Sequence, residues 1–187
     1  RRPMQSLISF LLTVKKPKAV LEIGTAVGFS SMLMSEYVSD NTIIDTIEKV
    51  PIRIKCAKEN FARYEKTERI NLFEGDAADV LKELAAAGNK YDFIFMDAAK
   101  GQYLNFLEPV IEMLAEDGLL VTDNVLQDGD IIQSRYAITK RDRTIHGRMR
   151  EYLYFLTHSE RFKTVVLPVG DGAALSQVVP GSISNND

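Results

Sequence analysis

Short apolar segments rich in β-branched and aromatic residues alternate with longer amphipathic segments from the start of the chain up to Asn124. This alternation is typical of βαβ units, in which parallel strands form one sheet and the connecting helices pack on both of its faces. Each intervening segment is long enough for a crossover helix. We therefore expect an α/β fold built on a parallel sheet. The expected strands are 19–23, 43–47, 70–74, 91–97 and 118–123, and the expected helices are 29–38, 51–65, 77–87 and 102–116.

The pattern changes after Asn124. A polar, basic stretch leads into an expected helix at 145–158. Two apolar segments, 162–169 and 173–179, then flank Gly-Asp-Gly, which is typical of a hairpin. We expect these two strands to be antiparallel to each other at the edge of the sheet, which brings the sheet to seven strands.

Length and composition limit the possible classes of protein. With 187 residues, 45% of them hydrophobic and 26% charged, the chain fits one domain, 1–187, with a flexible tail at 180–187. No apolar stretch approaches the roughly 20 residues that span a bilayer, so we expect no membrane contact. Cys56 is the only cysteine, which excludes an internal disulfide and fits a reducing cytoplasm, the expected location. Because the chain begins with Arg1 rather than methionine, we expect the natural protein to have a further N-terminal segment, which is absent here.

The turn after the first expected strand has the features of a ligand site. Gly24 and Gly28 lie where glycine lets the backbone approach a ligand at a helix N-terminus. Their G-x-x-x-G spacing lacks the third glycine of a dinucleotide fingerprint, so a ligand without phosphates fits better. Glu48 ends the second strand, where an acid can accept hydrogen bonds from ribose hydroxyls, and Asp76 ends the third. Together these residues suggest an adenosine-containing ligand, although Glu48 alone fits a solvated acid and Asp76 alone fits a helix N-cap.

Oxygen-bearing side chains also end the next two strands. Asp97 follows the fourth strand, and Asp123 with Asn124 follows the fifth. Two carboxylates and an amide are hard ligands suited to Mg²⁺ or Ca²⁺, and they leave about three octahedral positions for water or substrate. Lys100, three residues after Asp97, is placed to act as a base in the same cleft. The alternatives are a helix cap at Asp97, a turn at Asp123 and a solvated lysine.

Five motifs resemble, in order and spacing, the cation-dependent O-methyltransferases that include catechol and caffeoyl-CoA methyltransferases: EIGTAVGFS, the acid of IEK, GDA, MDAAK and TDN. The resemblance covers nearly the whole chain. It implies a Rossmann-like fold of the class I methyltransferases, a homodimer, and a methyl transfer from S-adenosylmethionine to a hydroxyl with Lys100 as general base. It places Mg²⁺ on Asp97, Asp123 and Asn124. It places S-adenosylmethionine beside Gly24, Ala26, Ser30, Glu48, Asp76, Ala77 and Asp97.

Within that family, MDAAKGQY, the basic segment after DNV and the terminal LPVGDG look most like the bacterial tRNA 5-hydroxyuridine methyltransferases. The implied reaction converts 5-hydroxyuridine in a tRNA anticodon into 5-methoxyuridine. The alternative is a small catechol-like or caffeoyl-CoA-like substrate. One departure bears on this choice: the tryptophan that lines the catechol pocket in the family is replaced here by Ala98 or Ala99, and the chain has no tryptophan.

Residues 134–150 form what we call the basic segment. Six positive side chains against one negative one give this segment a net charge of +5, so the rest of a chain with net charge −3 carries −8. A positive island on an acidic protein attracts a phosphate backbone, which makes tRNA the expected partner, although a solvated helix face or a lid gives the same pattern. The charged residues are Arg135, Lys140, Arg141, Asp142, Arg143, Arg148 and Arg150.

The remaining polar and aromatic residues carry weaker expectations. His146 and His158 are expected to be surface residues, because the related enzymes use a lysine as the base. Tyr103 and Tyr136 are candidates for stacking on an extruded base, but nothing in the sequence separates them from core aromatics.

Two other classes share part of the pattern. A dehydrogenase would use the acid at Glu48, but it would require the third glycine and would not need Asp123 and Asn124. A non-enzymatic RNA-binding module would keep the basic segment and have no use for Asp97. The whole set of residues favours the methyltransferase.

Overall fold

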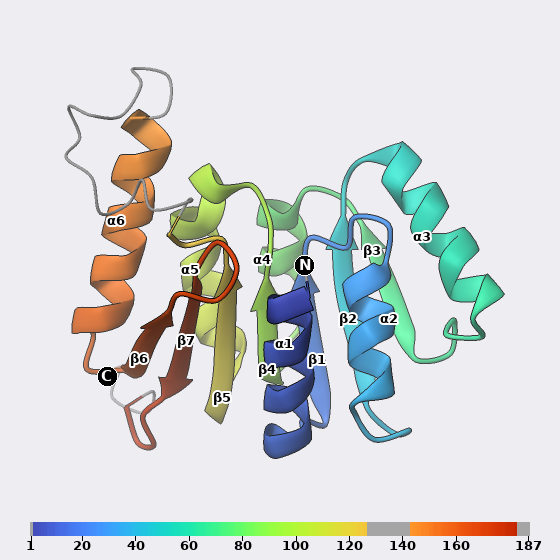
Figure 1. Ribbon diagram of the computed structural model, residues 1–187, viewed down its shortest axis with the longest axis horizontal. Coiled ribbons are helices and arrows are strands. Elements are labelled where there is room, and N and C mark those ends of the chain that lie inside the picture. Colours follow the sequence, from blue (N-terminus) through green and yellow to red (C-terminus); the bar gives the residue numbers. More distant parts are fainter. Residues whose placement is uncertain (1, 127–142, 183–187) are drawn as a thin grey trace.

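The computed structural model describes residues 2–126 and 143–182, and it contains a seven-stranded sheet with the order β3-β2-β1-β4-β5-β7-β6 (Figure 1). The first five strands are parallel, and β7 pairs antiparallel with both β5 and β6. The predicted α/β fold with an antiparallel edge is therefore confirmed. The strands are β1 Ala19–Ile23, β2 Ile43–Glu48, β3 Ile70–Glu74, β4 Tyr91–Met96, β5 Leu114–Asp123, β6 Phe162–Leu167 and β7 Ala173–Val178.

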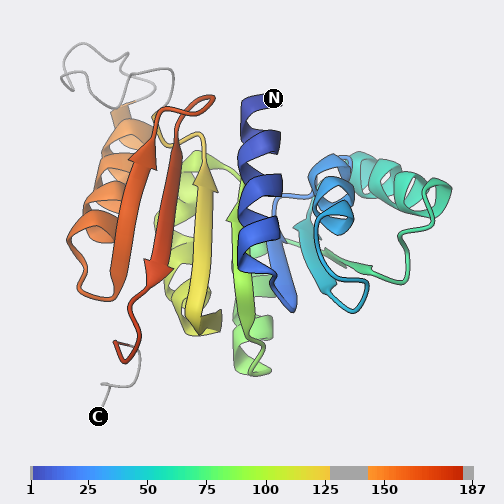
Figure 2. The same cartoon turned by 60° about the horizontal axis from the view of Figure 1, so that its bottom comes forward.

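Helices cover both faces of the sheet (Figure 2). One face packs against α1, α2 and α3, and the other packs against α4, α5 and α6. β4 shows the periodicity that produces this arrangement, because Phe93 and Phe95 enter the first core while Ile94 and Met96 enter the second. The helices are α1 Arg2–Lys15, α2 Phe29–Glu36, α3 Pro51–Arg63, α4 Ala77–Ala86, α5 Tyr103–Met113 and α6 Arg143–His158, with a short 3₁₀ helix, η1, at Lys100–Gln102.

Some element bounds differ from the prediction. β5 begins at Leu114 rather than at 118, because its pairing with β4 is irregular between Tyr91 and Phe93, and the extra residues are accommodated there. α6 begins at Arg143, two residues before the expected start. Within the described residues, no helix is both long and apolar enough to cross a bilayer.

The hairpin between β6 and β7 depends on two glycines. Gly170 and Gly172 have φ angles of 60° and 90°, which favour glycine. A Cβ at Gly172 would lie 2.3 Å from Cγ of Leu126, so the hairpin packs closely against the chain just after β5. The backbone N–H of Val125 donates to the Gly172 carbonyl at 3.1 Å. The hairpin therefore lies beside Asp123 and Asn124.

Several sequence expectations fall outside the described residues. They concern the first part of the basic segment and the end of the expected tail, namely Arg135, Tyr136, Lys140, Arg141, Asp142 and residues 183–187.

Candidate active site

The carboxyl ends of β1 to β4 open into one cavity of about 590 Å³. Glycines, acids and small side chains from the ends of four different strands line its wall, as expected for a ligand site in an open α/β sheet. Six of the seven residues predicted to contact the cofactor line this cavity, and Ser30 is the exception. The lining includes Gly24, Ala26, Glu48, Asp76, Ala77, Asp97, Ala98, Ala99 and Phe106.

The turn after β1 brings two strand ends into contact. The N–H of Gly24 donates to the Ile47 carbonyl of β2 at 3.1 Å. Gly24 has a φ of 111°, and a Cβ there would lie 2.1 Å from the backbone oxygen of Asp97. Only glycine fits between these two strand ends, so Gly24 sets the distance between the turn and Asp97. Ala26, with a φ of 49°, extends the same turn.

Glu48 is a nearly buried acid, with 7% of its surface exposed. One carboxylate oxygen accepts the N–H of Ala26 at 2.9 Å. The other accepts the N–H groups of Lys49 at 3.0 Å and Val50 at 2.9 Å. A carboxylate has about four acceptor positions, so these three bonds fix its orientation and still leave it able to accept a hydroxyl.

Asp76 has one of the two roles considered for it, that of a helix N-cap, and it also lies on the cavity wall. It is the N-cap of α4, where one carboxylate oxygen accepts the Ala78 N–H at 3.0 Å. The other oxygen accepts a hydrogen bond from the Lys49 ammonium at 3.0 Å. These bonds, the backbone one first, lower the pKa of Asp76, so it is a stable anion at the rim of the cavity.

Ser30 does not line the cavity. Its hydroxyl donates to Glu22, a fully buried acid of β1, which also accepts the hydroxyls of Ser31 and of Thr46, the latter at 2.6 Å. Burial raises the pKa of Glu22 despite these three donors. Sequence reasoning missed Glu22, although an acid inside the apolar run AVLEI followed by two adjacent serines was a usable signal. Ser30 thus contributes to the site by connecting α2 to β1.

Asp97 and Asn124 meet across neighbouring strands, as predicted. Met96 of β4 pairs with Thr122 of β5, so the residues that follow lie at the same edge of the sheet. The Asn124 amide donates to an Asp97 carboxylate oxygen at 3.0 Å. Asn124 has a φ of 61°, a left-handed conformation that asparagine tolerates, and its N–H donates to the Asp123 carboxylate at 2.7 Å. The two carboxylates and the amide therefore form one group.

This group has the electrostatics of a cation site. Burial, and to a smaller extent the negative charge of Asp97, raise the pKa of Asp123 to about 6. Burial also raises the pKa of Asp97, against the opposing effects of the Asn124 hydrogen bond and the Lys100 charge. A divalent cation would relieve the repulsion between the two acids, and a rotated Asn124 amide would present its oxygen. No cluster of three or more His, Cys, Asp or Glu side chains suited to a metal occurs in the described parts of the chain, and this group has only two such residues.

Lys100 begins η1, the short turn that follows β4. Its positive charge lowers the pKa of Asp97, so Lys100 is near enough to act on the acidic group. Tyr103 follows the same turn, but it is buried and makes an edge contact with Tyr152 at 5.5 Å. Its hydroxyl donates to the Asp123 carbonyl at 3.2 Å. Tyr103 is therefore a core residue that supports the strand end, not a surface for stacking.

The two histidines differ from each other. His146 is 1% exposed, so the expectation of a surface residue was wrong for it: the helical periodicity of α6 turns it inward together with Met149. His158 is exposed, as expected, and stacks on Tyr154 with ring centres 4.0 Å apart.

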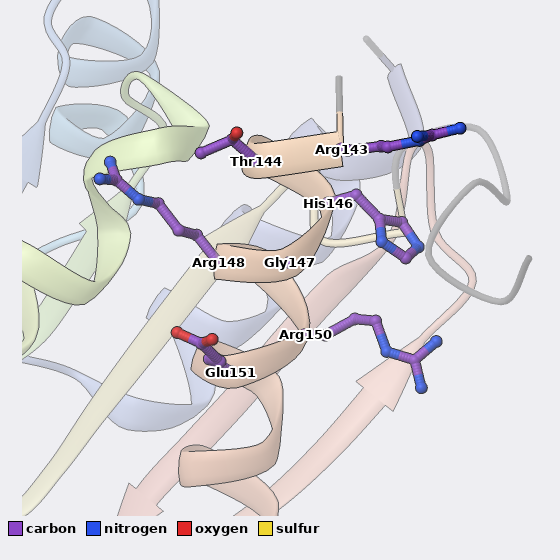
Figure 3. A pocket seen from close by; sticks show the side chains of 7 residues that line it. All are labelled: Arg143, Thr144, His146, Gly147, Arg148, Arg150 and Glu151. Carbon is purple, nitrogen blue, oxygen red and sulfur yellow. The ribbon is translucent and has the colours of Figure 1, made fainter. Parts of the chain in front are cut away.

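A second concave region, of about 780 Å³, surrounds the start of α6 (Figure 3). Its side chains come from one helix and point in different directions, with Arg148 extending away from the side that carries His146 and Arg150. It is larger than the cavity at the strand ends, but it includes none of the predicted catalytic or cofactor residues. The lining residues are Arg143, Thr144, His146, Gly147, Arg148, Arg150 and Glu151.

The fold and the site define a Rossmann-like α/β protein with a ligand cavity at the carboxyl ends of its parallel strands and an acidic group beside that cavity. The family model described as O-methyltransferase matches residues 3–179, and the chain belongs to this family. The predictions of fold, family and O-methyltransferase activity are confirmed.

Similar proteins agree with this assignment. O-methyltransferase ankF from Aspergillus thermomutatus is 28% identical, over 94% of this chain and 77% of the relative. Caffeoyl-CoA O-methyltransferase from Stellaria longipes is 29% identical, over 89% and 70% of the two chains. Among solved structures, a candidate caffeoyl-CoA O-methyltransferase from Staphylococcus aureus superposes with a TM-score of 0.87 at 32% identity, over 96% and 84%. The SAH-bound methyltransferase PaMTH1 from Podospora anserina has a TM-score of 0.82 at 27% identity, over 94% and 78%.

Proposed function

We propose that this chain transfers a methyl group from S-adenosylmethionine to a hydroxyl that has a second oxygen next to it, and that its substrate is 5-hydroxyuridine in a tRNA anticodon. The observation that carries the chemistry is the contact of Asn124 with Asp97 at adjacent strand ends, beside a cavity that Asp97 also lines. Cofactor and acceptor sites then share one wall, as a direct transfer between them requires.

The cavity suits S-adenosylmethionine. A SAH-bound relative with the same fold supports this cofactor. Glu48 would accept ribose hydroxyls, Asp76 and Ala77 would lie at the adenine end, and the turn from Gly24 to Ala26 would lie along the methionine part. The sulfonium needs no phosphate cradle, which agrees with the two-glycine turn.

The cation-binding residues would be Asp97, Asp123 and Asn124, and Mg²⁺ is the ion that their oxygens suit. When bound, Mg²⁺ would lower the pKa of a chelated hydroxyl. Lys100 would accept the hydroxyl proton on its neutral amine, and the resulting oxyanion would attack the methyl group in line with the departing sulfur. The chain's own task would be to align these groups, and the close packing at Gly24 and the β4–β5 register support this role.

Two features favour RNA over a small substrate. Arg143 and Arg150 place positive charge on α6, the helix that packs against the short turn carrying Lys100. Ala98 and Ala99 line the cavity where a catechol enzyme of this family has a tryptophan, which speaks against a flat slot for a small ring. The caffeoyl-CoA and catechol methyltransferases among the relatives favour the alternative, a small catechol-like or caffeoyl-CoA-like substrate. A cytoplasmic homodimer remains part of the proposal.

The direct test is mass spectrometry of tRNA nucleosides from cells that lack this gene. We expect 5-methoxyuridine to disappear and 5-hydroxyuridine to accumulate, and purified protein with S-adenosylmethionine and Mg²⁺ to restore the methyl group on the isolated tRNA. An unchanged nucleoside profile, together with efficient methylation of a free catechol, would establish the small-molecule alternative.

Glu48→Ala is expected to weaken S-adenosylmethionine binding by roughly 1 to 3 kcal/mol, the cost of losing hydrogen bonds to a charged group. Calorimetry without substrate measures this directly. Glu74→Ala is the matched control, because Glu74 pairs with Glu48 in the sheet register but binds Lys58 and is absent from the cavity wall. Equal affinities for the wild type and the Glu48 variant would mean that this acid only orders the backbone around it.

A further inference from the structure

The Arg148 side chain points away from the other arginines of α6 and contacts the turn that carries Lys100. Its guanidinium donates to the carbonyl oxygen of Gly101 at 2.8 Å. Figure 3 shows the side chain extending toward the neighbouring ribbon, while His146 and Arg150 lie on the opposite side of the helix. A Cβ added to Gly101 would lie 3.9 Å from both the Arg148 guanidinium and Ile145, so one turn of α6 lies directly over this residue.

The turn under Arg148 is short and is held at both ends. The Asp97 N–H donates to the Ile23 carbonyl at 3.0 Å, and Tyr103 is buried in the core. Between them, the Gln102 N–H donates to the Ala99 carbonyl at 2.8 Å to close η1. A helix of three residues makes few hydrogen bonds of its own, so a donor from another element adds to what holds it in place. Arg148 supplies a charge-assisted hydrogen bond, which is stronger and more directional than a neutral one.

We propose that Arg148 is a positioning residue for methyl transfer: by holding the Gly101 carbonyl, it fixes the backbone next to Lys100 and so the direction in which the Lys100 amine approaches the substrate hydroxyl. This inference rests on the proposed role of Lys100 as the base. The basic segment suggests a phosphate-binding role for Arg148. The present inference assigns Arg148 a different role, because its guanidinium already donates to a backbone carbonyl of the protein.

Arg148→Ala, assayed with S-adenosylmethionine and a small free catechol as the probe, is expected to lower kcat by roughly 10- to 100-fold, the scale of a small misalignment of reacting groups. The calorimetric affinity for S-adenosylmethionine should stay within about twofold of wild type. Arg148→Lys should recover part of kcat, because an ammonium can still donate one hydrogen bond to the Gly101 carbonyl. Lys163→Ala is the charge-matched control on β6 and should leave kcat unchanged.

A substrate-independent measurement keeps this test separate from the proposed function. We expect the acylation rate of Lys100 by an amine-reactive ester, followed by peptide mass spectrometry with Lys55 as internal reference, to change at least threefold in Arg148→Ala and less in Arg148→Lys. This result stands even if the wild-type protein methylates neither tRNA nor the catechol. Unchanged Lys100 reactivity, or a loss confined to the KM for tRNA with catechol kcat intact, would overturn the positioning role. If the alanine variant does not fold, the kcat for the catechol and the acylation rate of Lys100 in Arg148→Lys test the positioning role instead.

Discussion

Replacing Asp123 with alanine is expected to abolish methyl transfer while leaving the affinity for S-adenosylmethionine within about tenfold of wild type. The reason is that Asp97 lines the cavity proposed for the cofactor, whereas Asp123 is not part of the cavity wall. Asp123 is linked to Asp97 through Asn124, which donates to both carboxylates. Removing one of two carboxylates should also weaken divalent-cation binding by the protein alone, which calorimetry with Mn²⁺ measures without any substrate.

Asp117→Ala is the control, because Asp117 is an exposed acid on the same strand whose carboxylate pairs with Lys15 at 2.6 Å, away from the site. It should keep activity and Mn²⁺ binding, since a surface ion pair contributes at most about 1 kcal/mol to stability. Activity that persists in Asp123→Ala, or in wild type with excess EDTA, would contradict the metal assignment. A variant that loses both cofactor and cation binding would show that Asp123 supports the sheet edge as a whole.

Local sequence was sufficient to predict the strand ends. Both faces of this sheet are buried, so its parallel strands are rich in apolar residues, and an acidic residue lies at or just after the ends of β2, β3, β4 and β5. This pattern identifies Asp97 and Asp123 in the sequence. In the structure, the register of β4 with β5 places them at the same edge of the sheet. The turn after β1 could also be predicted from local sequence, because its backbone requires glycine: Gly24 has a φ of 111°, which almost no other residue adopts.

Contacts between distant segments could not be read in the same way. Glu22 is a charged residue inside a strand, and it is accommodated only because hydroxyls from α2 and β2 surround it. The burial of His146 depends on how α6 packs against the sheet. The Arg148 contact joins residues 47 positions apart, and in the sequence Arg148 is one more arginine of a basic segment. Charge composition predicts where cations gather, but tertiary structure decides which of them face solvent.

That distinction changes how the RNA hypothesis is tested. Neutralising Arg141 and Arg143 together, as Arg141→Gln and Arg143→Gln, is expected to raise the KM for tRNA and to flatten its salt dependence by up to about 0.7 to 0.9 log units per lost phosphate contact. Arg143 begins α6, and Arg141 lies outside the described residues. Arg148 is left intact, because its loss would disturb the Lys100 turn on any substrate.

Methylation of a free catechol is the internal control, since a small substrate without phosphates offers the arginines no backbone to bind. Its kcat and KM should barely change in the double variant, because phosphate contacts supply association energy at a distance from the reacting hydroxyl. KM for tRNA, measured between low and moderate salt in wild type and variant, gives the slope difference. Equal losses on both substrates would mean that the basic segment acts as a lid over the cleft. An unchanged tRNA slope with full activity would remove the electrostatic argument for RNA and leave the small-molecule alternative as the better account of this site.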